Sequence, residues 1–152
     1  MTRRLLLSYS LVSSLATCFT CAVAVLSAGF SAPAHAADVC VKVEVQNVRP
    51  QQGQLMVAAF GSAESFGKKP MAQMRVPAGE STTTFELCGL SGDSVALTMF
   101  QDLDSDGQMG HNLLGMPSEP WGSSGKPGTF GPSWETAKVA LDGSTIVVRL
   151  TQ

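Results

Sequence analysis

Three aspartates at alternate positions form the stretch of this sequence whose chemistry is easiest to name. Asp102, Asp104 and Asp106 open the run DLDSDGQMGHNLL and are followed directly by Gly107. A calcium loop of the EF-hand type supplies oxygen ligands from positions one, three, five, seven, nine and twelve, with glycine at position six. The three carboxylates, the glycine and the carbonyl of Gln108 meet the first five of these requirements. The spacing therefore predicts a calcium loop.

The second half of the loop departs from that pattern. Position nine is Gly110 and position twelve is Leu113, so the bidentate carboxylate that closes an EF-hand loop is missing. Glu119 follows a turn at Met116 and Pro117. If the chain folds back after that turn, Glu119 becomes the candidate for the missing ligand.

Two interpretations of the loop therefore stay open. Three carboxylates within five residues repel one another, and a cation neutralises that repulsion. Aspartate and glycine are also the ordinary residues of exposed turns, which need no metal. We expect either a plain turn or a calcium site of millimolar affinity, typical of extracellular modules. The predicted ligands are Asp102, Asp104, Asp106, Gln108 and Glu119.

Aromatic residues near the loop suggest a second kind of site. Trp121, Phe130 and Trp134 lie among glycine, serine and proline residues. Aromatic rings on the loops of a β-sandwich are a common means of holding sugars or peptides. The structural alternative is that Trp134 begins a strand and caps the core, while Trp121 packs over the acidic loop. The functional hypothesis is a carbohydrate- or peptide-binding module that needs no metal.

The sequence contains no pattern that predicts catalysis. Beyond the first 36 residues His111 is the one histidine, and no serine or cysteine nucleophile motif lies near it. We therefore expect His111 to be a solvated loop residue or a hydrogen-bond donor to the loop carboxylates, and we predict that the protein is not an enzyme. A third hypothesis is a structural component of the cell surface or periplasm that associates through an edge strand.

The first 36 residues predict export. Arg3 and Arg4 precede a long uncharged apolar run, which ends in the small-x-small triplet Ala34, His35, Ala36. These are the three parts of a secretory signal peptide. Cleavage after Ala36 would leave residues 37–152 as a single domain in the periplasm or the medium. No remaining stretch is apolar and long enough for a transmembrane segment.

Charge narrows the range of partners. Removing Arg3 and Arg4 leaves eight of the 10 basic residues against all 12 acidic ones, a net charge of −4. This balance argues against nucleic acid, which requires a basic surface. We expect the partner to be an envelope protein or a glycan.

Two cysteines, Cys40 and Cys88, lie beyond the predicted cleavage site. An oxidising compartment favours a disulfide between them. The alternative is a pair of buried, reduced and inert thiols. Both cysteines lie on the polar phase of alternating segments, so a bond between them would lie on the outer side or at the end of a sheet.

Short alternating segments predict an all-β fold. Residues 71–76 and 81–90 flank Pro77, Ala78 and Gly79, and we expect them to pair as a hairpin. Residues 102–133 form an unusually long loop without periodicity. About seven strands in a chain of this size predict an antiparallel Greek-key sandwich. The predicted strands are residues 39–48, 54–60, 71–76, 81–90, 94–101, 134–141 and 144–150.

The loop also carries a family resemblance. The run FQDLDSDGQMGHNLLGMPSEPWGSS, which continues a strand, resembles the uncharacterised bacterial family of small secreted domains catalogued as domain of unknown function 2141. That family shows an acidic loop of the type D-x-N-x-N-G, a G-x-P-x-E segment and an aromatic-glycine pair. The matching positions are Asp102, Asp104, Asp106, Gly107, Gly115, Pro117, Glu119, Trp121 and Gly122.

The resemblance covers residues 39–151 and implies a prealbumin-like or transthyretin-like β-sandwich. The chain departs from the family pattern at Gly110, where the family often has a further acidic residue. No activity comes with the family, so the resemblance adds a fold and a compartment to the expectations and leaves the function open.

Overall fold

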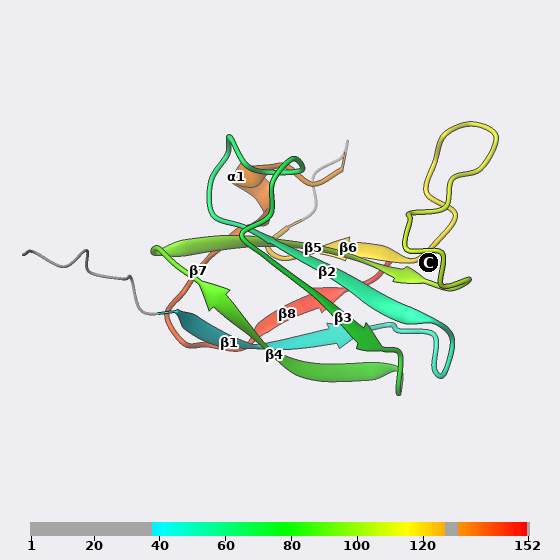
Figure 1. The fold of residues 1–152 in the computed structure, drawn as a ribbon, viewed down its shortest axis with the longest axis horizontal. Helices are drawn as coiled ribbons and strands as arrows, with labels where there is room; N and C mark the ends of the chain where they lie inside the picture. The colour runs from blue at the N-terminus through cyan, green and yellow to red at the C-terminus, as the bar shows by residue number, and fades with distance from the viewer. Residues whose placement is uncertain (1–37, 127–130, 152) are drawn as a thin grey trace, which may run out of the picture. The chain divides into compact units, whose positions relative to one another are not determined.

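Eight strands form two sheets in the computed structural model, which describes residues 38–126 and 131–151 (Figure 1). The smaller sheet has the order β4-β1-β8 and the larger one β3-β2-β5-β6, with β7 also paired to β5. The all-β, two-sheet architecture predicted from the sequence is confirmed. The elements are β1 (Val39–Gln46), β2 (Gln54–Phe60), β3 (Ala72–Pro77), β4 (Thr82–Leu90), β5 (Ser94–Asp102), β6 (Trp121–Ser123), α1 (Trp134–Ala137), β7 (Lys138–Ala140) and β8 (Ile146–Arg149).

Alternate residues of the strands form the core. Along β1, Val41, Val43 and Val45 are buried while their neighbours are exposed or half-buried, which is the period of two expected for a half-buried strand. The buried residues from the other strands are also mostly branched and aliphatic. They include Leu55, Val57, Leu87, Leu90, Val95, Leu97, Ile146, Val148 and Leu150.

The predicted hairpin of residues 71–76 and 81–90 is wrong. β3 pairs with β2 in the larger sheet, whereas β4 pairs with β1 in the smaller one. The segment between β3 and β4 is hydrogen-bonded instead to the turn after β1. Gln51 N donates to the carbonyl of Ala78 and Val48 N donates to the carbonyl of Ser81, each at 3.1 Å. Ala78 is buried at this crossing between the sheets. The chain therefore changes sheets where a tight turn was expected.

Residues 134–141 form a strand only in their second half. Ser133 and Thr136 make a capping box, in which each side chain accepts a hydrogen bond from the other residue's backbone amide. The cap starts the one-turn helix α1, so Trp134 begins a helix and not the predicted strand. β7 then pairs with β5 over three residues. No helix in the part of the chain that the structure describes has the length and apolar character to cross a membrane.

Two further details differ from the expected antiparallel sandwich. β8 runs parallel to β1, with Val43 opposite Ile146. The loop 102–133 is interrupted by β6, which pairs with β5 and brings the count of strands to eight. The predicted signal peptide, residues 1–36, and Phe130 lie outside the described residues.

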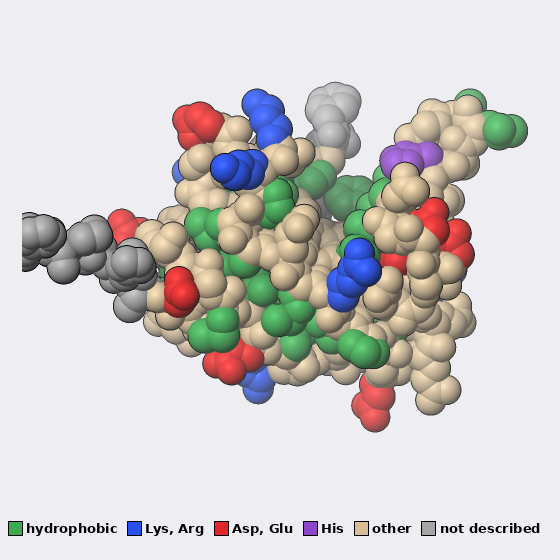
Figure 2. All heavy atoms as spheres, in the orientation of Figure 1, with side chains coloured by type: hydrophobic (Ala, Val, Ile, Leu, Met, Phe, Trp, Pro, Cys, Tyr) green, Lys and Arg blue, Asp and Glu red, His purple; other side chains and the backbone are tan. Residues whose placement is uncertain are grey.

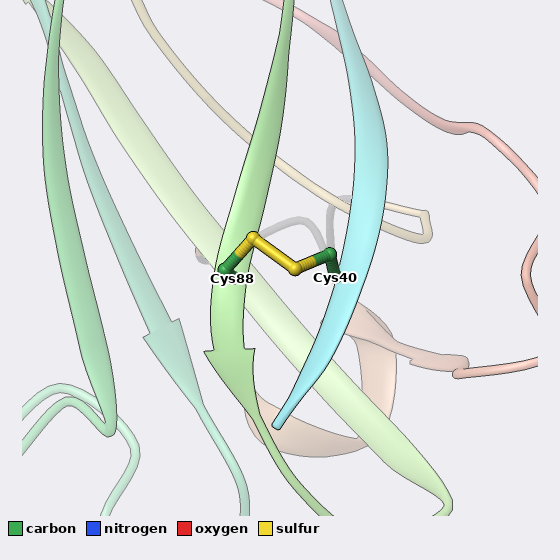
Figure 3. The surroundings of a disulfide bond; sticks show 2 residues. All are labelled: Cys40 and Cys88. Atoms are coloured by element: carbon green, nitrogen blue, oxygen red, sulfur yellow. A yellow bond between two sulfur atoms is a disulfide. The ribbon is translucent and has the colours of Figure 1, made fainter. Parts of the chain in front are cut away.

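The predicted disulfide is present. Cys40 on β1 and Cys88 on β4 are bonded, and both residues are exposed on the outer side of the smaller sheet (Figure 3). The register between the two strands shifts between Val39 and Val41, at the bonded residue. The bond therefore joins the first strand of the domain to its neighbour without crossing the core, as the polar phase of both cysteines predicted.

Removing this bond should lower the free energy of unfolding by about 4 kcal/mol, because it closes a loop between residues 48 positions apart in the unfolded chain. Urea denaturation of the Cys40→Ser/Cys88→Ser variant measures the change. Thr84→Ser, at an exposed site on β4, is the control and should leave stability within about 0.5 kcal/mol. A double variant as stable as the native protein would contradict the expectation.

Candidate functional site

The acidic loop is closed on the side chain of Asp102, the last residue of β5. Asp102 is fully buried. Its Oδ1 accepts a hydrogen bond from Asp106 N at 3.1 Å, and its Oδ2 accepts from Gly107 N and Gln54 Nε2, both at 3.0 Å. Gln54 lies opposite Asp102 in the pairing of β2 with β5. The loop backbone therefore folds around a carboxylate whose position is set by the larger sheet.

The other two aspartates continue the turn toward solvent. Asp104 Oδ1 accepts from Asp106 N at 3.2 Å, and Asp106 Oδ1 accepts from Gln108 N at 2.7 Å. Gly107 adopts a positive φ of 79°, a conformation that glycine adopts without strain. Carboxylate oxygens of Asp102, Asp104 and Asp106 all lie within 4.8 Å of one another. The structure therefore brings together the three predicted carboxylate ligands.

Glu119 folds back onto the loop but holds backbone amides. Its Oε1 accepts from Leu103 N at 2.7 Å and its Oε2 from Gly110 N at 2.9 Å. Glu119 does not belong to the close group of three aspartates. A Cβ at Gly110, where the family resemblance led us to expect a further acid, would lie 2.8 Å from Ser118 Oγ, so a larger residue there would displace the Ser118 side chain. Glu119 thus ties the entry of the loop to its exit.

The surroundings of Asp102 lower the pKa of its buried carboxyl group and so favour the ionised form. Burial raises the pKa of Asp102, but the hydrogen bonds from the Gln54 side chain and from the amides of Gly107, Asp106 and Ser105 outweigh that effect and leave the pKa below its ordinary value. Asp104 and Asp106 are exposed. The loop therefore concentrates three carboxylates, and the fold keeps one of them, Asp102, out of water.

An apolar groove lies beside the loop on the outer face of the larger sheet. It has a volume of about 680 Å³ and receives residues from β2, β3, β5, β6, the acidic loop and the segment after β2. Outward positions of solvent-facing strands are normally polar. Here Met56, Phe100 and Trp121 lie at such positions, beside the polar side chains of Gln73, Arg75 and Thr98. The groove residues used below are Met56, Ala58, Phe66, Phe100, Met109 and Trp121.

One cation lines the groove. Arg75 is exposed on β3, and its Nη2 lies 3.8 Å from the point where a Cβ on Gly107 would be. Within residues 38–126 and 131–151 the one ion pair joins Lys138 to Glu135, so Arg75 is not held by a carboxylate there. Its guanidinium thus lies between an apolar surface and the edge of the acidic loop.

The sequence-predicted aromatic site is brought together only in part. Trp121 on β6 lines the groove, and it also borders a second cleft of about 630 Å³ together with Gln46, Asn47 and Arg149. Trp134 lies in α1 and lines neither cavity. His111 is exposed. Trp121 and Trp134 therefore do not line a common cavity.

Sequence analysis missed the floor of the groove and its arginine. The available signal was the segment QLMVAAF, which is apolar on both phases. Inward Leu55 and Val57 are buried in the core, while the alternate Met56 and Ala58 line the groove. An apolar residue on the outward phase indicates either a covered face or a binding surface, and only the arrangement of strands distinguishes the two.

A profile of one protein family matches the chain over residues 43–149. The family is described as an uncharacterized protein conserved in bacteria (DUF2141). The match begins within β1 and ends at the last residue of β8, so it includes both sheets, the acidic loop and the groove. No curated protein and no solved structure matches the chain.

The Asp102→Asn variant should be less stable than the native protein by about 1–3 kcal/mol at pH 7, because the amide cannot accept every hydrogen bond that the carboxylate accepts. The native carboxylate, with its lowered pKa, contributes stability that is fully present above the ordinary aspartate pKa of about 4 and is lost as pH falls through the folded-state value. The difference between the two proteins should therefore shrink from pH 5 to pH 2.

Urea denaturation across that pH range measures the difference. Asp142→Asn is the control, since Asp142 also accepts hydrogen bonds from a neighbour in its turn but is exposed. It should change stability less than Asp102→Asn at pH 7. A gap between native protein and Asp102→Asn that stays constant down to pH 2 would contradict the assignment of Asp102 as the buried ionised group.

Proposed function

Since this chain belongs to the DUF2141 family of bacterial proteins, whose description assigns no activity, we propose that it is an exported, non-catalytic binding module. Its groove on the larger sheet binds an apolar segment that carries an acidic group. The loop that forms one wall of the groove is stabilised by calcium. The observation that carries the proposal is the groove itself, an apolar hollow on a sheet face that would otherwise be polar.

The lining of the groove supports a ligand with two chemical parts. Met56, Phe100 and Trp121 offer apolar and aromatic surface from three adjacent strands. Arg75 offers a guanidinium, which binds carboxylates through charge-assisted hydrogen bonds. Apolar pockets with a few placed polar groups are the usual form of a ligand site. Among the described lining residues Arg75 is the one charged group, and this composition favours binding over acid–base catalysis.

Calcium is proposed for the three grouped aspartates because close carboxylates are stabilised by a hard cation. Asp102, Asp104 and Asp106 would supply carboxylate oxygens and Gln108 its carbonyl. Glu119 uses each oxygen for one amide, and a carboxylate has further lone pairs for a metal. Gly107 and Met109, from the same loop, line the groove, so a cation that orders the loop would also shape the ligand site.

Export to the periplasm or the medium is supported by the disulfide. Bonds such as Cys40–Cys88 persist in oxidising compartments and are rare in the cytosol of most organisms. The predicted signal peptide, residues 1–36, points to the same compartment. The ligand would then be an envelope component that presents an apolar segment.

A glycan is the second candidate ligand, and Trp121 favours it. Trp121 lines the second cleft together with Gln46 and Asn47, whose side-chain amides also bond to Glu44, Arg149 and the carbonyl of Leu150. An aromatic face beside hydrogen-bonding amides suits a sugar ring. Titration with peptidoglycan fragments would change the emission of Trp121 if this cleft is used.

Calcium should raise the melting temperature of chelator-treated protein. At 10 mM calcium and a dissociation constant of about 1 mM, the gain in stability is about 1.4 kcal/mol, or roughly 5 °C for a domain of this size. Asp104→Ala should abolish the rise because it removes a ligand. Differential scanning calorimetry with and without calcium gives the measurement.

Asp93→Ala is the matched control, since Asp93 is exposed in the turn before β5 and lies outside the acidic group. This variant should keep the full calcium response. A native melting temperature that neither calcium nor chelator moves would show that the loop is a plain turn.

Decanoate, an alkyl chain with one carboxylate, should bind in the groove and change the fluorescence of Trp121. A Trp134→Phe background leaves Trp121 as the single tryptophan, because the sequence has two. Arg75→Gln should weaken decanoate binding about 10-fold through the loss of a charge-assisted bond. Ala58→Phe should block binding by filling the groove.

Lys42→Gln is the control for the loss of one positive charge, because Lys42 is exposed on β1 in the other sheet. It should leave decanoate affinity unchanged. Equal binding of decanoate and uncharged decanol would remove the role of Arg75, and no binding of either would remove the groove as a ligand site.

A further inference from the structure

Residues 110–118 form a short projecting turn, called the finger below. His111 and Pro117 bridge its two arms. At its end, Asn112 Oδ1 accepts from Leu114 N at 2.9 Å and from Met116 N at 3.1 Å, and Gly115 N donates to the Asn112 carbonyl at 2.9 Å. Figure 1 shows this yellow segment extending away from both sheets. The finger is therefore a defined turn that holds its tip clear of the domain.

The tip of the finger exposes large apolar side chains. Leu113 is 105% exposed, Leu114 82% and Met116 54%. Figure 2 shows hydrophobic side chains at the end of the projection, with acidic side chains at its base. Adjacent leucines that are this exposed on a defined turn indicate a surface that is covered by a partner. None of the residues from Gly107 to Ser118 is an aspartate, glutamate, lysine or arginine, so burying the tip desolvates no side chain of these four types.

The groove complements the finger in charge as well as in polarity. Exposed Asp104 and Asp106 lie at the base of the finger. The groove has Arg75 in its lining, and Lys68 and Lys69 are exposed immediately after Gly67, which also lines it. The tip of the finger, with Leu113 and Leu114, is thus an apolar knob on an acidic base. The groove is an apolar hollow with a basic edge. Opposite charges around an apolar contact favour association and fix its orientation.

We propose that the finger of one copy of this chain docks into the groove of a second copy. The proposal rests on the function proposed above and names the partner of that same groove. Gly107 and Met109, at the base of the finger, line the groove of their own copy, whereas none of residues 110–118 does so. The tip therefore leaves its own groove free for another molecule. Because knob and groove are different surfaces, the contact is heterologous, and copies join head to tail into a ring or an open chain.

Complementary variants test the contact. Leu113→Asp/Leu114→Asp removes the knob and keeps the groove, whereas Ala58→Phe fills the groove and keeps the knob. Sedimentation velocity should show association of the native protein that increases with concentration. Each variant alone should be monomeric, and an equimolar mixture should form one-to-one dimers and nothing larger, because it retains one intact knob and one intact groove.

Val147→Asp is the matched control for adding a charge at an exposed apolar site, since Val147 is 50% exposed on β8 in the smaller sheet. It should associate like the native protein. If Ala58→Phe does not fold, Arg75→Glu replaces it, and this charge reversal should reduce self-association at least 10-fold.

Three results would overturn the docking. They are a native protein that stays monomeric at 1 mM, a groove-filled variant that still self-associates, and a monomer that binds phosphatidylcholine vesicles through Leu113 and Leu114. Decanoate binding to the Leu113→Asp/Leu114→Asp variant separates the two proposals. Decanoate binding by a native protein that does not self-associate overturns the docking alone, and absence of decanoate binding to this folded variant, whose groove no finger occupies, overturns the groove function.

Discussion

The buried carboxylate of Asp102 is the interaction on which the loop region depends. A charge without contact with water is tolerated when hydrogen-bond donors surround it, and Gln54, Asp106 and Gly107 supply these donors. One donor comes from the neighbouring strand and two from the loop itself. The same carboxylate therefore joins the end of β5 to β2 and turns the chain after it. The position of the whole segment from the acidic turn to the finger follows from this arrangement.

Glu119 closes the other end of the loop that Asp102 starts. Its two oxygens hold the amides of Leu103 and Gly110, so the chain returns to its starting point before it enters β6. Between these contacts Gly107 and Met109 form one wall of the groove, and beyond Gly110 the finger projects. The acidic turn, the groove and the finger are consequently parts of one unit. A cation at the aspartates, a ligand in the groove and a partner on the finger would each influence the other two.

The larger sheet carries apolar side chains on both of its faces near this unit. Leu55, Val57 and Leu97 face the core, while Met56 and Phe100 face the groove. The strand interior supports this arrangement because β2 and β5 are paired on both sides, so their backbone groups are satisfied and only side chains are offered to a ligand. The floor of the groove thus includes two strands that are paired along both edges. Such a rigid floor is suited to binding, since little is ordered when the ligand arrives.

Local patterns in the sequence were sufficient for most of the strands, though not for β6 or the start of β7, for the polar position of Cys40 and Cys88 and for the clustering of the three aspartates. Side-chain alternation and closely spaced turn residues act over a few positions, so they are present in the chain before it folds. The pairing of β3 with β2, the capture of the Leu103 and Gly110 amides by Glu119 and the union of Met56, Arg75 and Trp121 in one groove arose only in the folded domain. Alternation shows which side of a strand faces the core, but it does not show which strand pairs with it. Each of these features joins residues that become neighbours only through the pairing of the strands.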